Sequence, residues 1–328
     1  MSREVVRSTQ ELRLERPLET RVTVMSEIWT ISEEAKELPG LIAHAKGICR
    51  GDDKVVAWTC AIEAVETAAT RGADLVHRLT GSVRPEDWVD VIVQQARGMT
   101  PVALLFGPSK RSKELAARVG AELDAGLSTE CIGVEREDDI SARRYVYGGL
   151  FVATEVATTV PFVATMAKGS ANGLSESPSA EIDDLEALSS PSVRVLEFRE
   201  RKGQTNLADA RTIVCVGRGV GTREGLEMAE SLATKMGGAL GCTRPVAEEL
   251  HWLPEEQYIG MSGQTVKPDL YLGLGVSGQV QHMSGTRDAK FIVGIDQNEN
   301  APIVAAADFA LIGDLYEIVP LLLESLSS

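Results

Sequence analysis

The sequence predicts an α/β protein with two domains, each built on a mainly parallel sheet that is flanked by helices. Three observations indicate this class. The chain has 328 residues, more than one domain usually contains. Short apolar runs alternate with helical stretches, which is the pattern of βαβ units. Only 5% of the residues are aromatic, so the cores must consist of Val, Ile, Leu and Ala, as in buried parallel sheets.

We expect the first domain at residues 21–192, after a polar N-terminal arm at 1–20. The run RVTVMS, at 21–26, predicts its first strand, and EEAKELPGLIAHAKGI predicts a helix that starts near Pro39. Strands are then predicted at 54–59, 73–79 and 99–107, with helices at 61–72, 86–98 and 109–123. From Lys168 to Ser192 the chain bears Ser, Gly and Pro without sustained periodicity, which predicts the crossing between the domains.

The second domain, expected at 193–328, repeats the alternation in doubly wound form. Strands are predicted at 211–217, 239–243, 269–276, 290–295 and 309–313, with a helix at 224–237 and another that starts in SGQVQHM. We expect Pro320 to interrupt the last segment, so that its helix begins near Val319. In such sheets ligands bind beyond the carboxyl ends of the strands.

Composition restricts the function. A formal charge of −15 argues against a nucleic-acid partner, and it fits either plain solubility or a basic protein partner. Five scattered cysteines form no CxxC pair, which favours reduced thiols in a cytoplasmic protein over a disulfide framework or a metal site. The acidic residues of the N-terminal arm and the lack of an 18-residue apolar run argue against a signal peptide, a transit peptide and membrane insertion.

A glycine loop, VGRGVGTREG, follows the strand predicted at 211–217. Gly217, Gly219 and Gly221 give GxGxG, but Thr222 stands where a dinucleotide fingerprint has its third glycine, so the motif alone is weak evidence. Arg218 strengthens it, because a guanidinium can hold a phosphate with two hydrogen bonds. The alternative is that Arg218 only closes the loop.

The segment YLGLGVSGQVQHMSG, at 271–285, is more informative. Its glycines permit close backbone approach, and Ser277 and Gly278 let a helix begin with free N–H groups that favour negative charge. His282 follows two residues into that helix, Arg244 follows another strand end, and Ser262 lies in a glycine turn. An arginine, a hydroxyl and an imidazole without an acid–base pair or matched nucleophile suit the binding of a large planar anion, and a flavin meets this description.

At these residues the sequence resembles the alpha subunit of electron transfer flavoprotein. The resemblance covers nearly the whole chain beyond the N-terminal arm, and LYLGLGVSGQVQHMSG is close to the family's signature. YVYGGL and CTRPVAEELHW are most similar to the branch found with nitrogen-fixation and carnitine operons. The resemblance implies a heterodimer with a beta subunit, one FAD held mainly by a C-terminal domain that can swivel, and a scaffold role for the first domain.

It also implies an electron carrier without substrate turnover of its own, which takes electrons from an acyl-CoA dehydrogenase or a related oxidoreductase. Carried over by matching position, Arg244 lies against the isoalloxazine, and Ser262 stands where the family has a threonine near flavin N5. His282 reaches the pyrimidine O2, and Gln281 lies by the ribityl chain.

The remaining positions carried over from the resemblance fall on the backbone contacts and on the ADP half. Ser277 and Gly278 give backbone contacts, whereas Arg218, Thr243 and Asp314 contact the ADP half. Thr243 has an alternative role as a helix N-cap, and Gln281 one in satisfying the backbone.

Three positions depart from the family pattern. In the loop of Gly260, Met261 replaces the usual glutamine and Gln264 a common lysine. Asp296 stands where the family has asparagine near the adenosine, and its carboxylate can accept a hydrogen bond from a ribose hydroxyl. Two other functions remain open from the residues alone: an NAD-dependent dehydrogenase built on the glycine loop, and a nucleotide-binding scaffold without redox activity.

Overall fold

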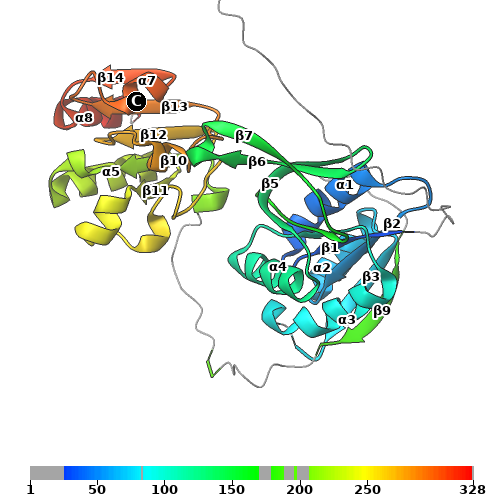
Figure 1. Cartoon of the computed structure of the whole chain (residues 1–328). Coiled ribbons are helices and arrows are strands. Elements are labelled where there is room, and N and C mark those ends of the chain that lie inside the picture. Colours follow the sequence, from blue (N-terminus) through cyan, green and yellow to red (C-terminus); the bar gives the residue numbers. More distant parts are fainter. Residues whose placement is uncertain (1–25, 83, 170–178, 188–195, 198–206, 327–328) are drawn as a thin grey trace, which may run out of the picture. The chain divides into compact units, whose positions relative to one another are not determined.

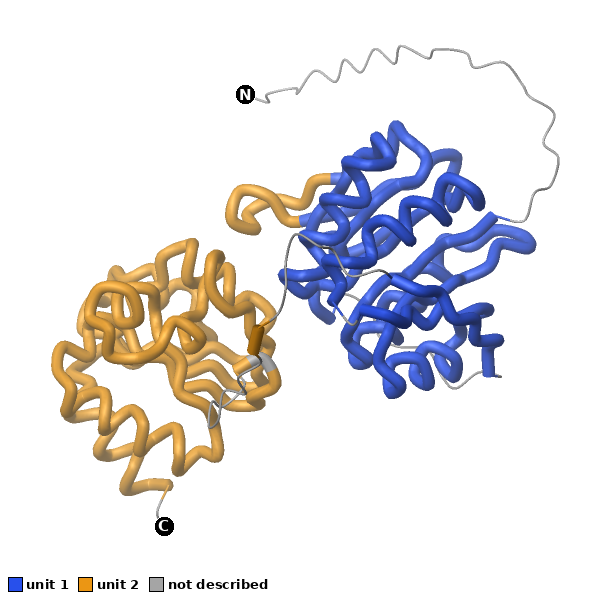
Figure 2. Tube along the Cα trace, turned by 90° about the horizontal axis from the view of Figure 1, so that it is seen from below, with its two compact units in different colours: residues 1–144, 154–190 blue, residues 145–153, 191–328 orange. Residues whose placement is uncertain are grey.

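A computed structural model of the chain describes residues 26–82, 84–169, 179–187, 196–197 and 207–326 (Figure 1). They divide between two compact units, one within residues 1–144 and 154–190 and the other within residues 145–153 and 191–328 (Figure 2). The predicted N-terminal arm and all but the last residue of the strand predicted at 21–26 lie outside the described residues. Within the described part of the chain, no helix is long and apolar enough to span a membrane.

The first sheet has nine strands in the order β7-β6-β5-β8-β4-β1-β2-β3-β9. Most neighbours pair in parallel, whereas β5 and β6 pair antiparallel. The turn between β6 and β7 is grouped with the second unit. The strands are β1 (Glu27–Ile31), β2 (Lys54–Thr59), β3 (Leu75–Thr80), β4 (Ala103–Phe106), β5 (Leu127–Arg136), β6 (Ile140–Val146), β7 (Phe151–Val156), β8 (Phe162–Met166) and β9 (Glu181–Glu186).

Helices cover both faces of the first sheet, because successive side chains of a buried strand point to opposite sides. Ile28 of β1 packs with α1 (Leu38–Ile48) and α2 (Ile62–Thr70). Trp29, the next residue, packs with α3 (Val89–Met99) and α4 (Lys110–Glu122). Pro39 lies at the start of α1, as predicted.

In the first unit two predicted segments differ from the structure, and the strands β5 to β8 were not predicted. The strand that opens the sheet is EIWTI, at Glu27–Ile31, directly after the predicted run. The stretch predicted as a domain crossing contains the strand β9. Its sequence, EIDDLE, has no apolar alternation, and it pairs with β3 at the sheet edge, where Arg78 Nε donates to Asp184 Oδ1 at 2.7 Å. At this edge an exposed ion pair accompanies the packing of Leu185 on the core.

The second unit contains a five-stranded parallel sheet in the order β11-β10-β12-β13-β14. Helices α5 and α8 pack on one face, and α7 packs on the other. The elements are β10 (Thr212–Val216), α5 (Arg223–Lys235), β11 (Ala239–Cys242), β12 (Leu270–Leu274), α6 (Val280–Met283), β13 (Ile292–Asp296), α7 (Pro302–Ala306), β14 (Phe309–Ile312) and α8 (Leu315–Ser325). The predicted fold class is therefore confirmed, and each unit has a mainly parallel sheet flanked by helices.

Two helices of the second unit differ from the prediction. The helix predicted to start in SGQVQHM is a single turn, Val280–Met283. Helix α8 runs through Pro320 without interruption. A proline removes one backbone hydrogen bond, but α8 buries Leu315 and Val319 in the core that it shares with α5, and this packing outweighs the loss.

Candidate functional site

The strand order places a switch point between β10 and β12. From β10 the chain crosses to β11, which pairs with one edge of β10, and it later passes to β12, which pairs with the other edge of β10. The loops that leave the carboxyl ends of β10 and β12 therefore diverge, and the crevice between them is where doubly wound sheets bind ligands.

Glycines bring the two loops at this switch point into contact. The N–H of Gly219 donates to the carbonyl of Gly275 at 3.0 Å. A Cβ on Gly217 would overlap the Gly275 carbonyl, and one on Gly219 would lie 2.8 Å from the same oxygen. Gly275 itself has φ +58°, which favours glycine. The GxGxG pattern is thus explained first by the close approach of two backbones.

A cavity of about 210 Å³ opens beside these loops. It is lined by residues that follow β10, β12, β13 and β14: Gly219, Gly275, Asp296, Gln297, Gly313, Asp314, Leu315 and Tyr316. The structure thus brings together Asp296 and Asp314, two of the residues predicted for the ADP half. Each carboxylate accepts one backbone N–H at 2.8 Å through Oδ1, from Asn298 and Tyr316 respectively, which leaves Oδ2 to accept from a ligand hydroxyl.

Tyr316 was missed by the sequence prediction. Its hydroxyl donates to the carbonyl of Val220 at 2.7 Å and lies 2.8 Å from Thr222 Oγ1, so it fixes the end of the glycine loop against the start of α8. The signal in the sequence was its place two residues after Asp314, which caps α8.

A second group of predicted residues meets where the loop after β11 contacts α6. The N–H of Met261 donates to the carbonyl of Gln281 at 2.7 Å, which joins the loop of Gly260 to the first turn of α6. Gly260 has φ +152°, and a side chain there would crowd that same carbonyl. Ser262 Oγ lies 3.1 Å from the Tyr258 hydroxyl, and the side chains of Met261, Ser262 and Gln281 are exposed.

The two predicted arginines are each paired with one of two adjacent glutamates. Arg244 precedes a π-helical turn, Pro245–Glu249, and its Nε donates to Glu248 Oε2 at 2.6 Å. Arg218 lies 3.7 Å from Glu249. Both guanidinium groups remain largely exposed, at 63% for Arg244 and 72% for Arg218, so they can reach an anion in solution. Thr243 is buried, and its N–H donates to the carbonyl of Val216.

His282 lies in a buried, hydrogen-bonded environment. Its ring is buried, with Nδ1 at 2.8 Å from the carbonyl of Ile259 and Nε2 at 2.6 Å from the Tyr271 hydroxyl. Burial lowers the pKa of His282 to about 4, so the imidazole is neutral at pH 7. Both ring nitrogens already have partners within the chain.

Ser277 and Gly278 lie directly before α6. The carbonyl of Ser277 accepts from the N–H of Ile303 at 3.1 Å, and its side chain is exposed. Gly278 has φ +76° and packs against the backbone of Ile303, where a Cβ would overlap. These two residues therefore bind the loop after β12 to α7.

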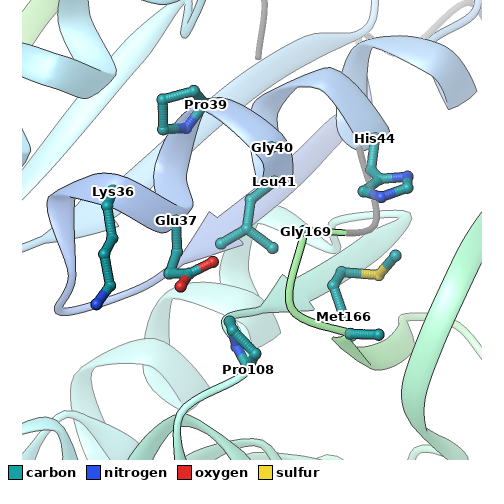
Figure 3. Close-up of a pocket in the computed structure, with 10 residues that line it drawn as sticks. Lys36, Glu37, Pro39, Gly40, Leu41, His44, Pro108, Met166 and Gly169 are labelled. Carbon is teal, nitrogen blue, oxygen red and sulfur yellow. The ribbon is translucent and has the colours of Figure 1, made fainter. Parts of the chain in front are cut away.

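The first unit has a smaller cavity, of about 120 Å³ (Figure 3). It lies between the start of α1 and the residues after β4 and β8, and Leu41, Pro108 and Met166 supply apolar walls. His44 lines it as well, and burial lowers the pKa of this histidine. None of the predicted site residues lies here.

The second unit defines the class of the protein. A doubly wound parallel sheet, with interlocked glycine loops at its switch point and carboxylates at the next strand ends, is a nucleotide-binding domain. Residues 206–287 match the family described as "Electron transfer flavoprotein FAD-binding domain", and residues 39–190 match "Electron transfer flavoprotein domain".

Curated relatives match over nearly their full lengths. Protein FixB of Salmonella paratyphi A is 35% identical over 317 residues, which cover 92% of this chain and 98% of that protein. Protein FixB of Escherichia coli O127:H6 is 31% identical, with 93% and 100% covered. YdiR of Escherichia coli K12, provisionally named an electron transfer flavoprotein subunit, is 33% identical, with 92% and 99% covered. The chain belongs to the electron transfer flavoprotein alpha-subunit family, and its cofactor is FAD.

Proposed function

We propose that this chain is the alpha subunit of a heterodimeric electron transfer flavoprotein, and that its second domain, residues 193–328, holds the FAD. The main observation behind this proposal is the cavity at the switch point of the second sheet, because Asp296 and Asp314 line it together with the glycine loops. The loop of Met261 and the turn of Gln281, which are hydrogen-bonded to each other, supply further exposed polar groups to the same unit.

The residues present fit a dinucleotide at its polar half. The free oxygens of Asp296 and Asp314 suit ribose hydroxyls, because a carboxylate can only accept hydrogen bonds. Arg218, beside the interlocked glycines, suits the diphosphate. The absence of side chains on Gly219 and Gly275 leaves backbone at the cavity wall, so a ligand can approach closely.

A second set of residues would contact the isoalloxazine half of the FAD. The bound flavin supplies the redox chemistry when it is present. Arg244 provides an exposed cation that favours extra negative charge on the ring, while the Ser262 hydroxyl offers both a donor and an acceptor. The backbone hydrogen bond from Met261 to Gln281 holds together the two segments that would contact the ring.

The proposed partners are a beta subunit, which completes the heterodimer, and an acyl-CoA dehydrogenase or related oxidoreductase, which reduces it. The alternative of an NAD-dependent dehydrogenase is disfavoured by the match of residues 206–287 to a FAD-binding domain.

Co-expression with a beta subunit of this family tests this function. The purified heterodimer is expected to show flavin absorption bands. When it is mixed with a substrate-reduced acyl-CoA dehydrogenase in a stopped-flow instrument, the flavin absorbance should fall. A heterodimer that stays colourless after incubation with excess FAD contradicts the proposal. A yellow heterodimer that no dehydrogenase reduces contradicts only the assignment of the electron donor.

A further inference from the structure

Three buried polar side chains form a cluster on the face of the second sheet that also packs α7. Tyr271 comes from β12, Cys215 from β10, and His282 from α6. The Tyr271 hydroxyl lies 2.6 Å from His282 Nε2, and Cys215 Sγ lies 3.9 Å from the same nitrogen. Tyr271 and Cys215 are fully buried, so their polar atoms depend on partners within the cluster.

The direction of each hydrogen bond follows from its partners. The carbonyl of Ile259 can only accept, so His282 Nδ1 must carry a proton. A neutral imidazole then has an unprotonated Nε2, which accepts. The Tyr271 hydroxyl is therefore the donor to Nε2, and the ring is held in a single tautomer.

This ring links two loops of the candidate FAD site. Its Nδ1–H holds the carbonyl of Ile259, directly before Gly260. Its own backbone belongs to α6, where the carbonyl of Gln281 accepts from Met261. The position of the imidazole therefore fixes both the loop of Met261 and the turn of Gln281. The hydrogen bond from Tyr271 anchors the ring to β12, a central strand of the sheet.

We propose that Tyr271 is a positioning residue for the FAD site: its hydroxyl fixes the tautomer and orientation of His282, which in turn holds the loop of Met261 against the turn of Gln281. The proposal rests on the proposed function, because it concerns the same FAD site.

The hydrogen bond can be measured without FAD. In the full-length chain, paired with an unlabelled beta subunit, ¹⁵N-labelled histidine gives signals from only four residues. Two-bond ¹H–¹⁵N spectra of ligand-free protein are expected to show His282 as the Nδ1–H tautomer. In Tyr271→Phe the Nε2 signal should move toward that of an unbonded nitrogen. In Tyr258→Phe, which removes another buried hydroxyl of this unit that bonds Ser262, it should stay unchanged.

The functional consequence is a change in FAD affinity. Loss of one buried hydrogen bond corresponds to roughly a tenfold higher Kd for FAD in Tyr271→Phe. An Nε2–H tautomer in the wild-type protein overturns the proposal even if Tyr271→Phe fails to fold. Unchanged His282 signals, or an unchanged Kd, in a folded variant overturn it too. If the wild-type protein binds no FAD, the proposed function fails, and the spectra still decide the role of Tyr271.

Discussion

The two units have the same kind of switch point, but they fill it differently. In the first unit the carboxylate of Glu33, after β1, accepts hydrogen bonds from Ser109 Oγ at 2.6 Å and Ser112 Oγ at 2.8 Å, at the start of α4. The Ser32 hydroxyl also fills this space, since a Cβ added to Gly107 would lie only 3.0 Å from Ser32 Oγ. In the second unit the corresponding loops meet through bare glycine backbones, and a cavity of about 210 Å³ lies beside them.

This difference shows that the sheet topology provides a crevice, while the side chains decide whether it can hold an anion. Helix N-termini favour negative charge, and in the first unit an internal carboxylate already supplies it. In the second unit the predicted anion contacts, Arg218 and Arg244, are exposed and paired only with surface glutamates. A ligand phosphate can replace such weak surface pairs.

The largest effect is expected when a side chain is added at the switch point of the second unit, which makes it resemble the filled switch point of the first unit. Gly217→Ala should separate the two loops, because its Cβ overlaps the Gly275 carbonyl. We expect roughly a hundredfold weaker FAD binding and a loss of about 2 to 4 kcal/mol in the free energy of unfolding. FAD titration and urea unfolding measure the two effects. Gly98→Ala, in α3 where the added Cβ meets nothing within 4 Å, is the control and should be neutral or slightly stabilising.

A lower pH should reduce the free energy of unfolding of the second unit through the protonation of His282 on unfolding. Its pKa is lowered to about 4 in the folded chain, below the ordinary value of 6.5, so unfolding takes up a proton between these values. The stability is complete above pH 6.5 and falls as the pH drops toward 4, with a loss of about 2 kcal/mol at pH 5. Urea unfolding at pH 7.5 and pH 5 checks this. His282→Gln should flatten the pH dependence, and an equally steep dependence in that variant would contradict the assignment.

Removal of the exposed cation should shift the flavin potential more gently. In Arg244→Ala the reduced flavin loses a neighbouring positive charge, so the midpoint potential should fall by an amount on the order of tens of millivolts. A spectroelectrochemical titration of the FAD-loaded heterodimer measures it. Arg244→Lys keeps the charge and should retain most of the potential. Equal potentials in the alanine variant and the wild type would remove Arg244 from the ring site.

The smallest effect is expected at the first switch point. Glu33→Gln weakens the two hydrogen bonds from Ser109 and Ser112, and it should reduce the free energy of unfolding by about 1 kcal/mol. FAD binding should not change, since the second unit holds the cofactor. Thermal unfolding and FAD titration together test this, and weaker FAD binding in Glu33→Gln would contradict the division of roles.

The sequence predicted the elements whose apolar pattern is regular and whose ends carry clear signals. Pro39 and Ser109 mark helix starts in the structure as they do in the sequence. The strand β9 could not be found in this way, because its partner strand β3 lies 106 residues away along the chain. The prediction at Pro320 was wrong for a related reason, because the packing of α8 against α5 is a tertiary contact that the local sequence does not show.

The candidate site was predictable to a similar degree. Its residue types and positions at strand ends followed from the sequence and the resemblance, and the structure brings Asp296 together with Asp314 and Met261 together with Gln281. The partners of His282 were not predictable, because they come from a buried face of β12 and from the carbonyl of Ile259. A side chain's hydrogen bonds depend on three-dimensional contacts that no local pattern encodes.

The central claim is that the glycine-lined crevice of the second unit holds the FAD. The most direct measurement is an equilibrium titration of the ligand-free heterodimer with FAD, run side by side for the wild type and Gly217→Ala. We predict that the wild type binds FAD and that the variant, still folded and still paired with its beta subunit, loses the FAD of this chain. A folded variant that binds FAD as tightly and to the same stoichiometry as the wild type would contradict the claim.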